Sequence, residues 1–290
     1  MDSMVRNPDV KQRDAAQAVV VAVSSDAIFD PEVEQVHGAT EPLRKGDAFS
    51  FMKAIQVVNE RLLTLNSDET LLFDVILLSN DSEEKHSRII ASAKHYGLDI
   101  GRFCFCNKED SIESLQSNEV KLFLSMDTND VCKALQKGVP AALLYHQTDP
   151  NHQTEDQLKV VFSGDVIGSS EEMLHGLREQ GFTETQLQGF KTAKGSVKEF
   201  AILMGEMRRR FGLEGSPLCT GLMTVWSSRD VCASALKTLR GWGLLVDEAF
   251  CLAGAPRSPI LNLGFIGNTM KSSTYVKEGR DYSMYYGLEV

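Results

Sequence analysis

The sequence predicts an α/β fold with two tandem repeats, each built on a parallel sheet. Short apolar runs typical of buried strands alternate with longer segments in which apolar residues recur at helical spacing. This alternation is typical of doubly wound sheets, in which helices cover both faces. The same order of segments occurs over 17–147 and over 158–290, which indicates an internal duplication. Chance similarity between two generic strand–helix units is the alternative.

The elements of the first repeat follow from its apolar pattern. Residues 1–16 are polar and predict a flexible tail ahead of the repeat. The run 18–29 predicts the first strand, and 47–65 predicts a helix with Asp47 as its N-cap. Further strands and helices are expected, in alternation, over 71–80, 83–98, 100–106 and 120–146.

The second repeat follows a polar linker at 148–157. It begins with "VVFSGDVIG" (160–168), which matches "VAVSSDAIF" (21–29) and aligns Ser163 with Ser24. Three further segments match in the same order: 221–227 with 75–81, 233–254 with 91–106, and 261–270 with 120–129.

The composition restricts the classes of partner. The formal net charge of −10 repels polyanions and argues against a nucleic-acid polymer, although a small phosphate ligand fits one local site. The triplet Arg208–Arg210 predicts a solvated helix face or, alternatively, an anion site. The six cysteines show no C-x-x-C spacing and are interpreted as reduced core thiols without a metal or redox role.

Two further features concern the compartment. No apolar stretch approaches the roughly 20 residues that a membrane span requires. The first residues are polar and acidic, whereas a signal peptide is basic and then apolar. We therefore expect a cytoplasmic protein that has no membrane partner.

Several stretches are similar to the type I cytosolic 5′-nucleotidases, a family of the haloacid dehalogenase superfamily. The most specific are "VAVSSDAIFD", "AFSFMKAIQVVNERL", "HYGLDIGRFC", "ALKTLRGWGLLVDEAFCLAGAPRSP" and the segment around "FSGD". The resemblance implies haloacid-dehalogenase-like Rossmannoid units, with a small helical cap at about 171–212 in the second repeat. It also implies Mg²⁺-dependent hydrolysis of nucleoside monophosphates such as AMP and IMP to nucleoside and phosphate.

The resemblance places the family's catalytic groups in the second repeat. In the family, one aspartate attacks phosphorus, and a second aspartate two residues later is the general acid and base. Here Ser163 stands at the nucleophile position and Asp165 retains the acid/base position. A carboxylate is ionised at pH 7 and attacks unaided, whereas a serine hydroxyl needs a neighbouring base. None of the six histidines lies in this stretch.

Other family positions also differ. Thr224 retains the phosphate-holding hydroxyl, while Arg257 stands where the family has lysine, which keeps the charge but changes the donor geometry. Gly267 and Asn268 fall where an acidic pair completes the family's Mg²⁺ site. Because the nucleophile and the metal carboxylates are missing together, this chain resembles a degenerate member of the family.

Polar residues of the first repeat mimic the same positions. Ser24 and Asp26 correspond to the nucleophile loop, and Ser79 corresponds to the phosphate-holding turn. Ser125 and Asp127 fall at the position of the family's acidic pair, late in the repeat. This repeat also lacks a leading aspartate. It is therefore expected to serve as a structural half that packs against the second, with a regulatory ligand site as the alternative.

The sequence thus predicts a pseudoenzyme: a degenerate 5′-nucleotidase homologue that binds a nucleoside monophosphate or phosphate, or acts as an interaction protein with an empty pocket. A phosphate could be held without metal by Ser163, Asp165, Thr224 and Arg257, so no cofactor is expected. One alternative is an active Mg²⁺-dependent 5′-nucleotidase. Another is a structural partner of an active paralogue, in a homo-oligomer or a hetero-oligomer.

Overall fold

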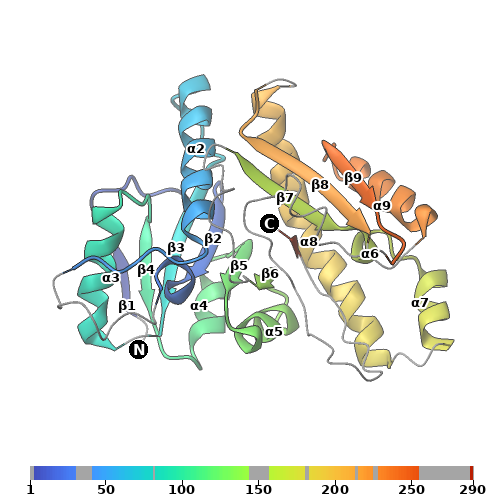
Figure 1. The fold of residues 1–290 in the computed structure, drawn as a ribbon, viewed down its shortest axis with the longest axis horizontal. Helices are drawn as coiled ribbons and strands as arrows, with labels where there is room; N and C mark the ends of the chain where they lie inside the picture. The colour runs from blue at the N-terminus through green and yellow to red at the C-terminus, as the bar shows by residue number, and fades with distance from the viewer. Residues whose placement is uncertain are drawn as a thin grey trace.

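Two sheets organise the chain, and each belongs to one half of the sequence (Figure 1). The computed structural model describes residues 3–30, 41–80, 82–143, 157–179, 183–212, 215–224, 228–254 and 288–289. The first half contributes β1 (Ser3–Arg6), β2 (Val19–Ser24), α1 (Ser25–Ile28), α2 (Phe49–Leu65), β3 (Phe73–Ser79), α3 (Glu83–His95), β4 (Arg102–Phe105), α4 (Ser111–Ser117), β5 (Leu122–Ser125), α5 (Thr128–Gln136) and β6 (Ala141–Leu143). The second half contributes β7 (Leu158–Ser163), α6 (Gly164–Ile167), α7 (Glu171–Glu179), α8 (Glu184–Phe211), β8 (Leu218–Thr224), α9 (Arg229–Gly241), β9 (Glu248–Cys251) and β10 (Leu288–Glu289).

The first sheet has the strand order β1-β4-β3-β2-β5-β6. Strands β2 to β6 are parallel, and β1 pairs antiparallel with β4 at the edge. Every residue of β3 is buried, as expected for a parallel strand covered on both faces. The strand order reverses between β2 and β5, which is the position where doubly wound sheets form ligand sites.

The second sheet has the order β10-β7-β8-β9, with β7 to β9 parallel and β10 antiparallel to β7. The predicted α/β class with largely parallel sheets is therefore confirmed. Strands β7, β8 and β9 have the same neighbour order as β2, β3 and β4. Both β2 and β7 end in a serine that is the N-cap of a four-residue helix, Ser24 before α1 and Ser163 before α6. The internal duplication is consistent with this likeness and stays a prediction.

The N-terminal segment differs from the flexible tail that the sequence predicted. Strand β1 pairs with β4, and the side chains of Asn7 and Arg13 donate to the backbone carbonyls of Ile100 and Phe73. The polar residues of this segment thus satisfy backbone groups beside the sheet. A polar composition at a sheet edge does not require disorder, because an edge strand faces solvent.

Helix α2 begins two residues after the predicted N-cap. Its N-cap is Ala48, which makes no side-chain capping bond, and Asp47 lies one residue outside. The backbone N–H of Ala48 donates to the carbonyl of Ala27, and that of Gly46 donates to the carbonyl of Ile28. These two bonds tie the segment before α2 to α1, so tertiary contacts rather than a side-chain cap fix where the helix begins.

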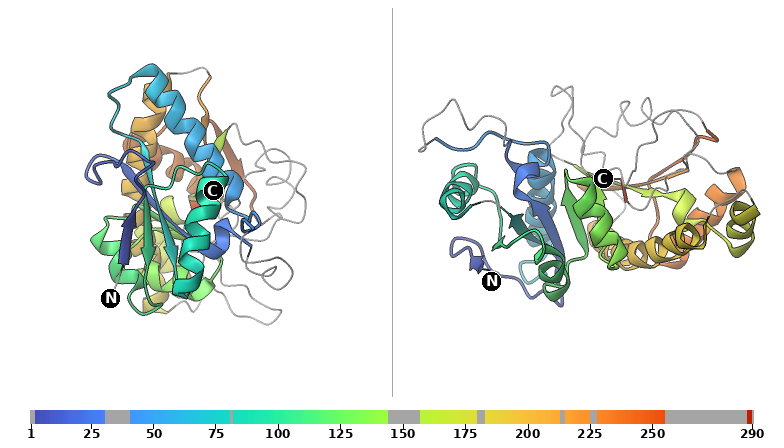
Figure 2. Two further views of the ribbon diagram at one scale, coloured as in Figure 1. Left: turned by 90° about the vertical axis from the view of Figure 1, so that its left-hand side faces the viewer. Right: turned by 90° about the horizontal axis from the view of Figure 1, so that it is seen from below.

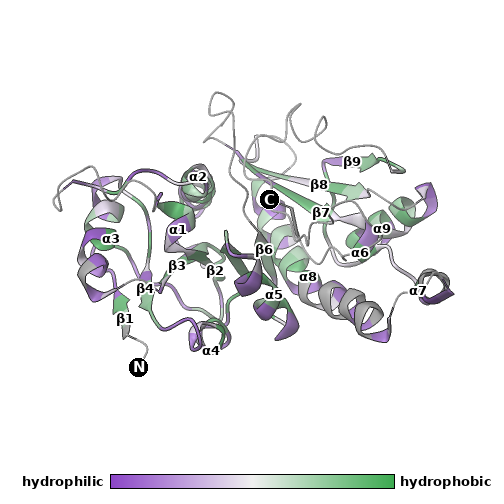
Figure 3. Ribbon diagram, turned by 60° about the horizontal axis from the view of Figure 1, so that its bottom comes forward, coloured by the Kyte–Doolittle hydropathy of each residue, from purple (hydrophilic) through white to green (hydrophobic). Residues whose placement is uncertain are grey.

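One apolar core joins the two sheets. It includes residues of β2, β3 and α2 together with residues of β7, β8 and α8, and Phe73, Phe162 and Phe200 are among its largest fully buried side chains. Figure 2 shows the two halves side by side, and α2 contacts β7 while α5 contacts α8 at their junction. Hydrophobic residues follow the strands, and hydrophilic residues gather on α3, α5 and α7 (Figure 3). The two halves therefore share a core.

The second part of α8 belongs to this core. Phe200, Ala201, Met204 and Met207 are all buried in the shared core, and the Phe200 ring lies 6.3 Å from that of Phe162 on β7. This part of α8 is the crossover helix between β7 and β8, as α2 is between β2 and β3. The range predicted for a cap, 171–212, was therefore too long: only α7 and the first part of α8 lie outside the crossover.

The arginine triplet near the end of α8 is engaged within the fold. Each of its members has a partner: Arg208 pairs with Asp247 at 2.5 Å, Arg209 donates to the Gly243 carbonyl at 3.0 Å, and Arg210 pairs with Glu69 of the first half at 2.7 Å. These contacts favour a structural role over the alternative of an anion site. No helix within the described ranges is long and apolar enough to cross a membrane.

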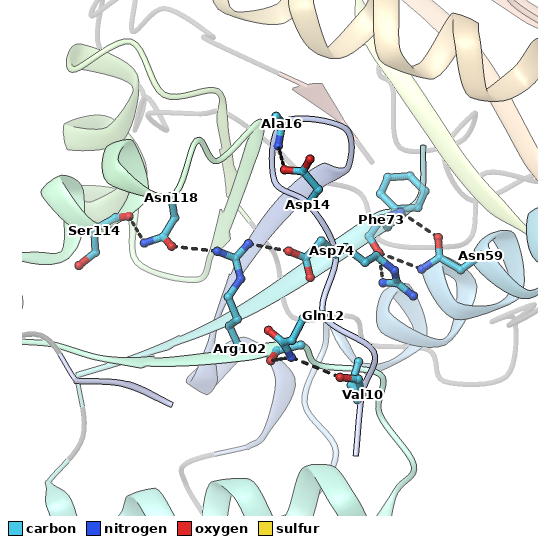
Figure 4. A network of polar contacts seen from close by, with 12 residues as sticks. Val10, Gln12, Asp14, Ala16, Asn59, Phe73, Asp74, Arg102, Ser114 and Asn118 are labelled. Atoms are coloured by element: carbon cyan, nitrogen blue, oxygen red, sulfur yellow. Dashed lines mark hydrogen bonds and ion pairs between the residues drawn. The ribbon is translucent and has the colours of Figure 1, made fainter. Parts of the chain in front are cut away.

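A buried ion pair joins β3 to β4 near their amino ends (Figure 4). Arg102 Nη2 lies 2.5 Å from Asp74 Oδ2, and Arg102 Nη1 donates to Asn118 Oδ1 at 2.9 Å. The Asp74 side chain is only 3% exposed. A Cβ at Gly101 would lie 2.8 Å from Asp74 Oδ1, so glycine is needed beside this carboxylate. The pair links the amino ends of two neighbouring strands of the first sheet.

We expect Arg102→Met to lower the free energy of unfolding by about 3–5 kcal/mol, because it leaves the Asp74 carboxylate buried without its charge partner. Lys94→Met is the matched control: it breaks the Lys94–Asp9 pair, which is 2.7 Å long but exposed on both sides, and should leave the free energy of unfolding almost unchanged. Urea denaturation measures both. Equal effects of the two substitutions would contradict a special role for the buried pair.

Candidate phosphate-binding site

The candidate site lies at the carboxyl ends of β7 and β8. The parallel register places Ser163, the last residue of β7, beside Met223, so that Thr224 follows as the last residue of β8. The chain leaves β7 directly into α6, which carries Asp165. The structure therefore places Ser163, Asp165 and Thr224 at one edge of the sheet, where α/β proteins form ligand sites. Arg257, Gly267 and Asn268 lie outside the described residues.

Ser163 has no base bonded to it in the described part of the chain. Its side chain is half-buried and, although Ser163 is the N-cap of α6, makes no capping hydrogen bond. Among the described histidines, His86 and His95 belong to α3 in the first half, and His175 lies 3.7 Å from Glu179 on α7. A serine hydroxyl without a base is a weak nucleophile.

Thr224 packs tightly against the loop that follows Ser163. It is fully buried, and its Oγ1 donates to the Phe250 carbonyl at 3.4 Å. A Cβ at Gly164 would lie 2.4 Å from Thr224 Cγ2, so only glycine fits between the strand ends. In the first half, Ser24 pairs with Leu78 as Ser163 pairs with Met223. By this register Ser25 and Ser79 stand at the positions of Gly164 and Thr224, a larger residue in the loop and a smaller one on the strand. In each half one of the two facing residues is small, but it is the loop residue in the second half and the strand residue in the first.

Cys232 of α9 adds a thiol to this edge. Burial raises the pKa of Cys232, and the negative charge of Asp165 acts in the same direction. The Thr224 side chain acts in the opposite direction and lowers the pKa of Cys232 in part. Cys232 thus belongs to the electrostatic surroundings of this edge, although the sequence pattern assigns it only to the core.

Lys194 is a further cation that the sequence analysis missed. Its Nζ donates to the Ser169 carbonyl at 2.9 Å, just after α6, and no ion pair joins it to a carboxylate among the described residues. Burial lowers the pKa of Lys194. Because α8 brings it to this loop from a distance along the chain, no local pattern could have identified it.

The first half has a comparable edge at its switch point between β2 and β5. Ser24 and Ser125 end these two neighbouring strands, and the buried Ser24 Oγ has no hydrogen-bond partner. Asp127 is the N-cap of α5 and accepts from the Asn129 N–H at 2.8 Å. Lys108 Nζ lies 2.9 Å from the Asp127 carboxylate. A carboxylate of the chain itself thus occupies the helix end that could otherwise receive an anion.

The charges at this edge balance one another in part. The hydrogen bond from Lys108 lowers the pKa of Asp127, whereas burial and the Asp127 charge raise the pKa of Asp130. The sequence pattern identifies Asp127 but not Lys108, which comes from a different loop; Asp130, three residues after Asp127 in the first turn of α5, could have been recognised from its spacing. The internal neutralisation agrees better with the structural role expected for this half than with the alternative of a regulatory site.

The described residues at the candidate site do not match a magnesium site. Mg²⁺ prefers several hard oxygen ligands with carboxylates among them. Ser163, Asp165 and Thr224 offer one carboxylate and two hydroxyls, and no group of three or more metal-binding side chains occurs within the described ranges. These residues form a site with hydroxyl donors and a single acid.

Comparison with known proteins identifies the class to which this fold and site belong. A family model described as 5′-nucleotidase matches residues 11–264, so the chain belongs to the 5′-nucleotidase family. The resemblance to cytosolic 5′-nucleotidases inferred from the sequence is confirmed.

One relative can be named. The chain is 37% identical to human cytosolic 5′-nucleotidase 1B over 268 residues, which cover 84% of this chain and 44% of the human protein. The chain therefore spans less than half the length of that relative.

We expect Gly164→Ala to destabilise the protein by about 1–3 kcal/mol, because the new methyl group overlaps the buried Thr224 side chain. Adding Thr224→Ser removes that methyl and keeps the hydroxyl, as in the first half, and should recover a large part of the loss. Thermal denaturation of both single variants and the double variant measures the coupling. If the stability changes of the two single variants simply add up in the double variant, the contact between Gly164 and Thr224 is contradicted.

The Lys108–Asp127 pair predicts a pH effect. Because the pKa of Asp127 is lower in the folded state, its contribution to stability is present above its unfolded value, about 3.9, and is lost as the pH falls through the folded value. Lys108→Met should raise this pKa, as followed by the Asp127 carboxyl resonance during an NMR titration. Lys133→Met removes a positive charge of α5 itself and should leave the pKa of Asp127 unchanged; equal shifts in both variants would argue against the pair.

Proposed function

We propose that this protein is a catalytically degenerate member of the 5′-nucleotidase family that binds a nucleoside monophosphate or inorganic phosphate without hydrolysing it. The observation that carries the proposal is Ser163. It presents a half-buried hydroxyl at the strand end where the resemblance requires an attacking carboxylate, and no base is bonded to it among the described residues.

The remaining groups suit a phosphate. The Ser163 hydroxyl can donate to a phosphate oxygen, the Thr224 hydroxyl could do so only by leaving the Phe250 carbonyl, and Lys194 offers a half-buried cation at the following loop. Arg257, predicted at the family's lysine position, would add a bidentate donor. Replacing the family's attacking carboxylate with serine also removes a negative charge that would repel the phosphate. In family-type chemistry, the metal ion offsets this repulsion. Binding therefore needs no Mg²⁺ or other cofactor.

The cellular location and the partners of this protein are inferred from the family. The name of the human relative places that protein in the cytosol, and we extend this location to the present chain. The partner is then a small phosphate-containing molecule of nucleotide metabolism. Assembly as a structural partner of an active paralogue is the alternative, and it requires no ligand in this site.

We expect no Mg²⁺-dependent release of phosphate from AMP or IMP, because a serine without a base replaces the attacking carboxylate. In thermal melts, AMP, IMP or phosphate should raise Tm by mass action, equally with EDTA and with Mg²⁺. Arg257→Ala should abolish that rise, whereas Arg257→Lys should weaken it. Arg240→Ala, which removes an exposed arginine of α9, is the matched control.

Each other outcome selects a different function. Phosphate release that Asp165→Asn abolishes would establish an active nucleotidase and overturn the proposal. A Tm rise that requires Mg²⁺ would mean that the chain completes a metal site. If millimolar ligand does not raise Tm, the protein acts as an interaction protein instead, for example as the partner of an active paralogue. Ser163→Asp alone should not restore hydrolysis, because Gly267 and Asn268 still lack carboxylates.

A further inference from the structure

Helix α8 contains a glycine that packing does not explain. At Gly205 an added Cβ would lie 2.6 Å from the Gly243 carbonyl oxygen, so the close approach of the two segments requires glycine there. At Gly195, which is exposed, an added Cβ would meet no atom of the described fold within 4 Å. Its φ angle also lies outside the left-handed region that favours glycine. Neither space nor backbone geometry therefore requires glycine at position 195.

A glycine at this position weakens the helix locally. Inside a helix glycine is among the least favourable residues, because its backbone loses more freedom on folding than that of any other residue. Sharp bends in long helices occur at glycine–serine pairs, and Gly195 is followed by Ser196. Hinges use residues that can absorb changes in φ and ψ. Gly195 is thus a weak point inside a helix of 28 residues.

The surroundings of α8 change at this weak point. In the first part of α8 (184–194), the described side chains that precede Lys194 are exposed. The second part (196–211) contributes buried side chains to the shared core from Val197 onward. The core therefore holds the second part, and Gly195 lies where that packing begins.

Lys194 ties the first part of α8 to the loop that contains α6. Its Nζ donates to the Ser169 carbonyl at 2.9 Å, at the end of this loop. Ser169 is buried, and its Oγ donates to the Val166 carbonyl at 2.7 Å. A Cβ at Gly168 would lie 2.3 Å from the Val231 carbonyl oxygen, so the loop packs directly on α9. The acceptor of the Lys194 bond is therefore fixed to the rest of the second half.

The ion pairs of the first part of α8 join it to α7 instead. Lys191 Nζ lies 2.9 Å from Glu171 Oε1, and Arg178 Nε lies 2.5 Å from Glu184 Oε1. Lys194, in contrast, donates to a neutral carbonyl, which is a weaker partner than a carboxylate. Burial lowers the pKa of Lys194, so release into water restores hydration to its ammonium group. The bond to Ser169 can therefore open more easily than the ion pairs within the α7–α8 unit.

We propose that α8 bends at Gly195, so that α7 and the first part of α8 move as one arm while the second part stays in the core. The Lys194–Ser169 bond holds this arm closed. Because the loop that ends at Ser169 begins at Ser163, opening the arm changes the surroundings of the candidate site. The inference rests on the helix and on this bond, and it does not depend on a ligand in the site.

Residue-resolved amide hydrogen exchange of the full chain, without ligand, tests the hinge. In an α-helix each N–H donates to the carbonyl four residues earlier, so the amides of 196–198 donate across Gly195. Bending opens these bonds and leaves those within each part of the helix intact. We expect the amides of 196–198 to exchange at least about tenfold faster than those of 188–192 and 202–206. Protection that rises steadily from Glu184 along the helix would indicate fraying and overturn the proposal.

Gly195→Ala strengthens the helix at the hinge without a clash. It should slow exchange at 196–198 about fivefold and leave 202–206 unchanged, because the core already holds the second part. Gly241→Ala is the matched control: an added Cβ there also has open space, but the residue ends α9, so exchange in α8 should not change. If Gly195→Ala slows all of α8 equally, or slows nothing, the helix moves as one rod and the hinge is contradicted.

Lys194→Met tests the bond that closes the arm. Methionine keeps much of the apolar stem but cannot donate to Ser169, so exchange at 196–198 should accelerate several-fold. Lys191→Met is the matched control on the same helix: it breaks the exposed pair with Glu171 and should have little effect on these amides. Equal acceleration by the two variants, or none by Lys194→Met, would mean that the Ser169 contact does not hold the arm and would overturn the proposal.

Discussion

The candidate site depends above all on the close approach between the loop after β7 and the end of β8. Parallel pairing brings Ser163 beside the last residues of β8. The Thr224 methyl group then occupies the space that a side chain at position 164 would need, so glycine is required there. Because Thr224 is buried and bonded to the Phe250 carbonyl, its position fixes the path of the loop and therefore the positions of Ser163 and Asp165.

Contacts elsewhere in the structure support the carboxyl ends of β7 and β8. One core runs from the first sheet through α2 to β7, β8 and the second part of α8. Arg210 of α8 pairs with Glu69 of the first half, and the buried Asp74–Arg102 pair stabilises the amino ends of β3 and β4. The elements that carry the candidate site therefore share one close-packed core with the first half.

The two halves treat the same edge of the sheet in different ways. In the first half, the Asp127 carboxylate sits at the start of α5 against Lys108, so the chain supplies its own anion. In the second half, Ser163 and the half-buried Lys194 leave donors that a phosphate could use. The contrast explains why one edge suits a structural role while the other suits a ligand, although both begin with a serine and a one-turn helix.

The sequence by itself determined the α/β class, the strands over 71–80 and 160–163, and the chemistry of Ser163 and Thr224. A continuous apolar run identifies a strand covered on both faces, and residue type alone fixes what a side chain can donate. Only the tertiary structure decided that β1 joins the sheet, that the second part of α8 is a crossover helix, and that Lys194 reaches the loop after α6. These depend on contacts between segments distant along the chain, whose geometry is set by packing and not by local pattern.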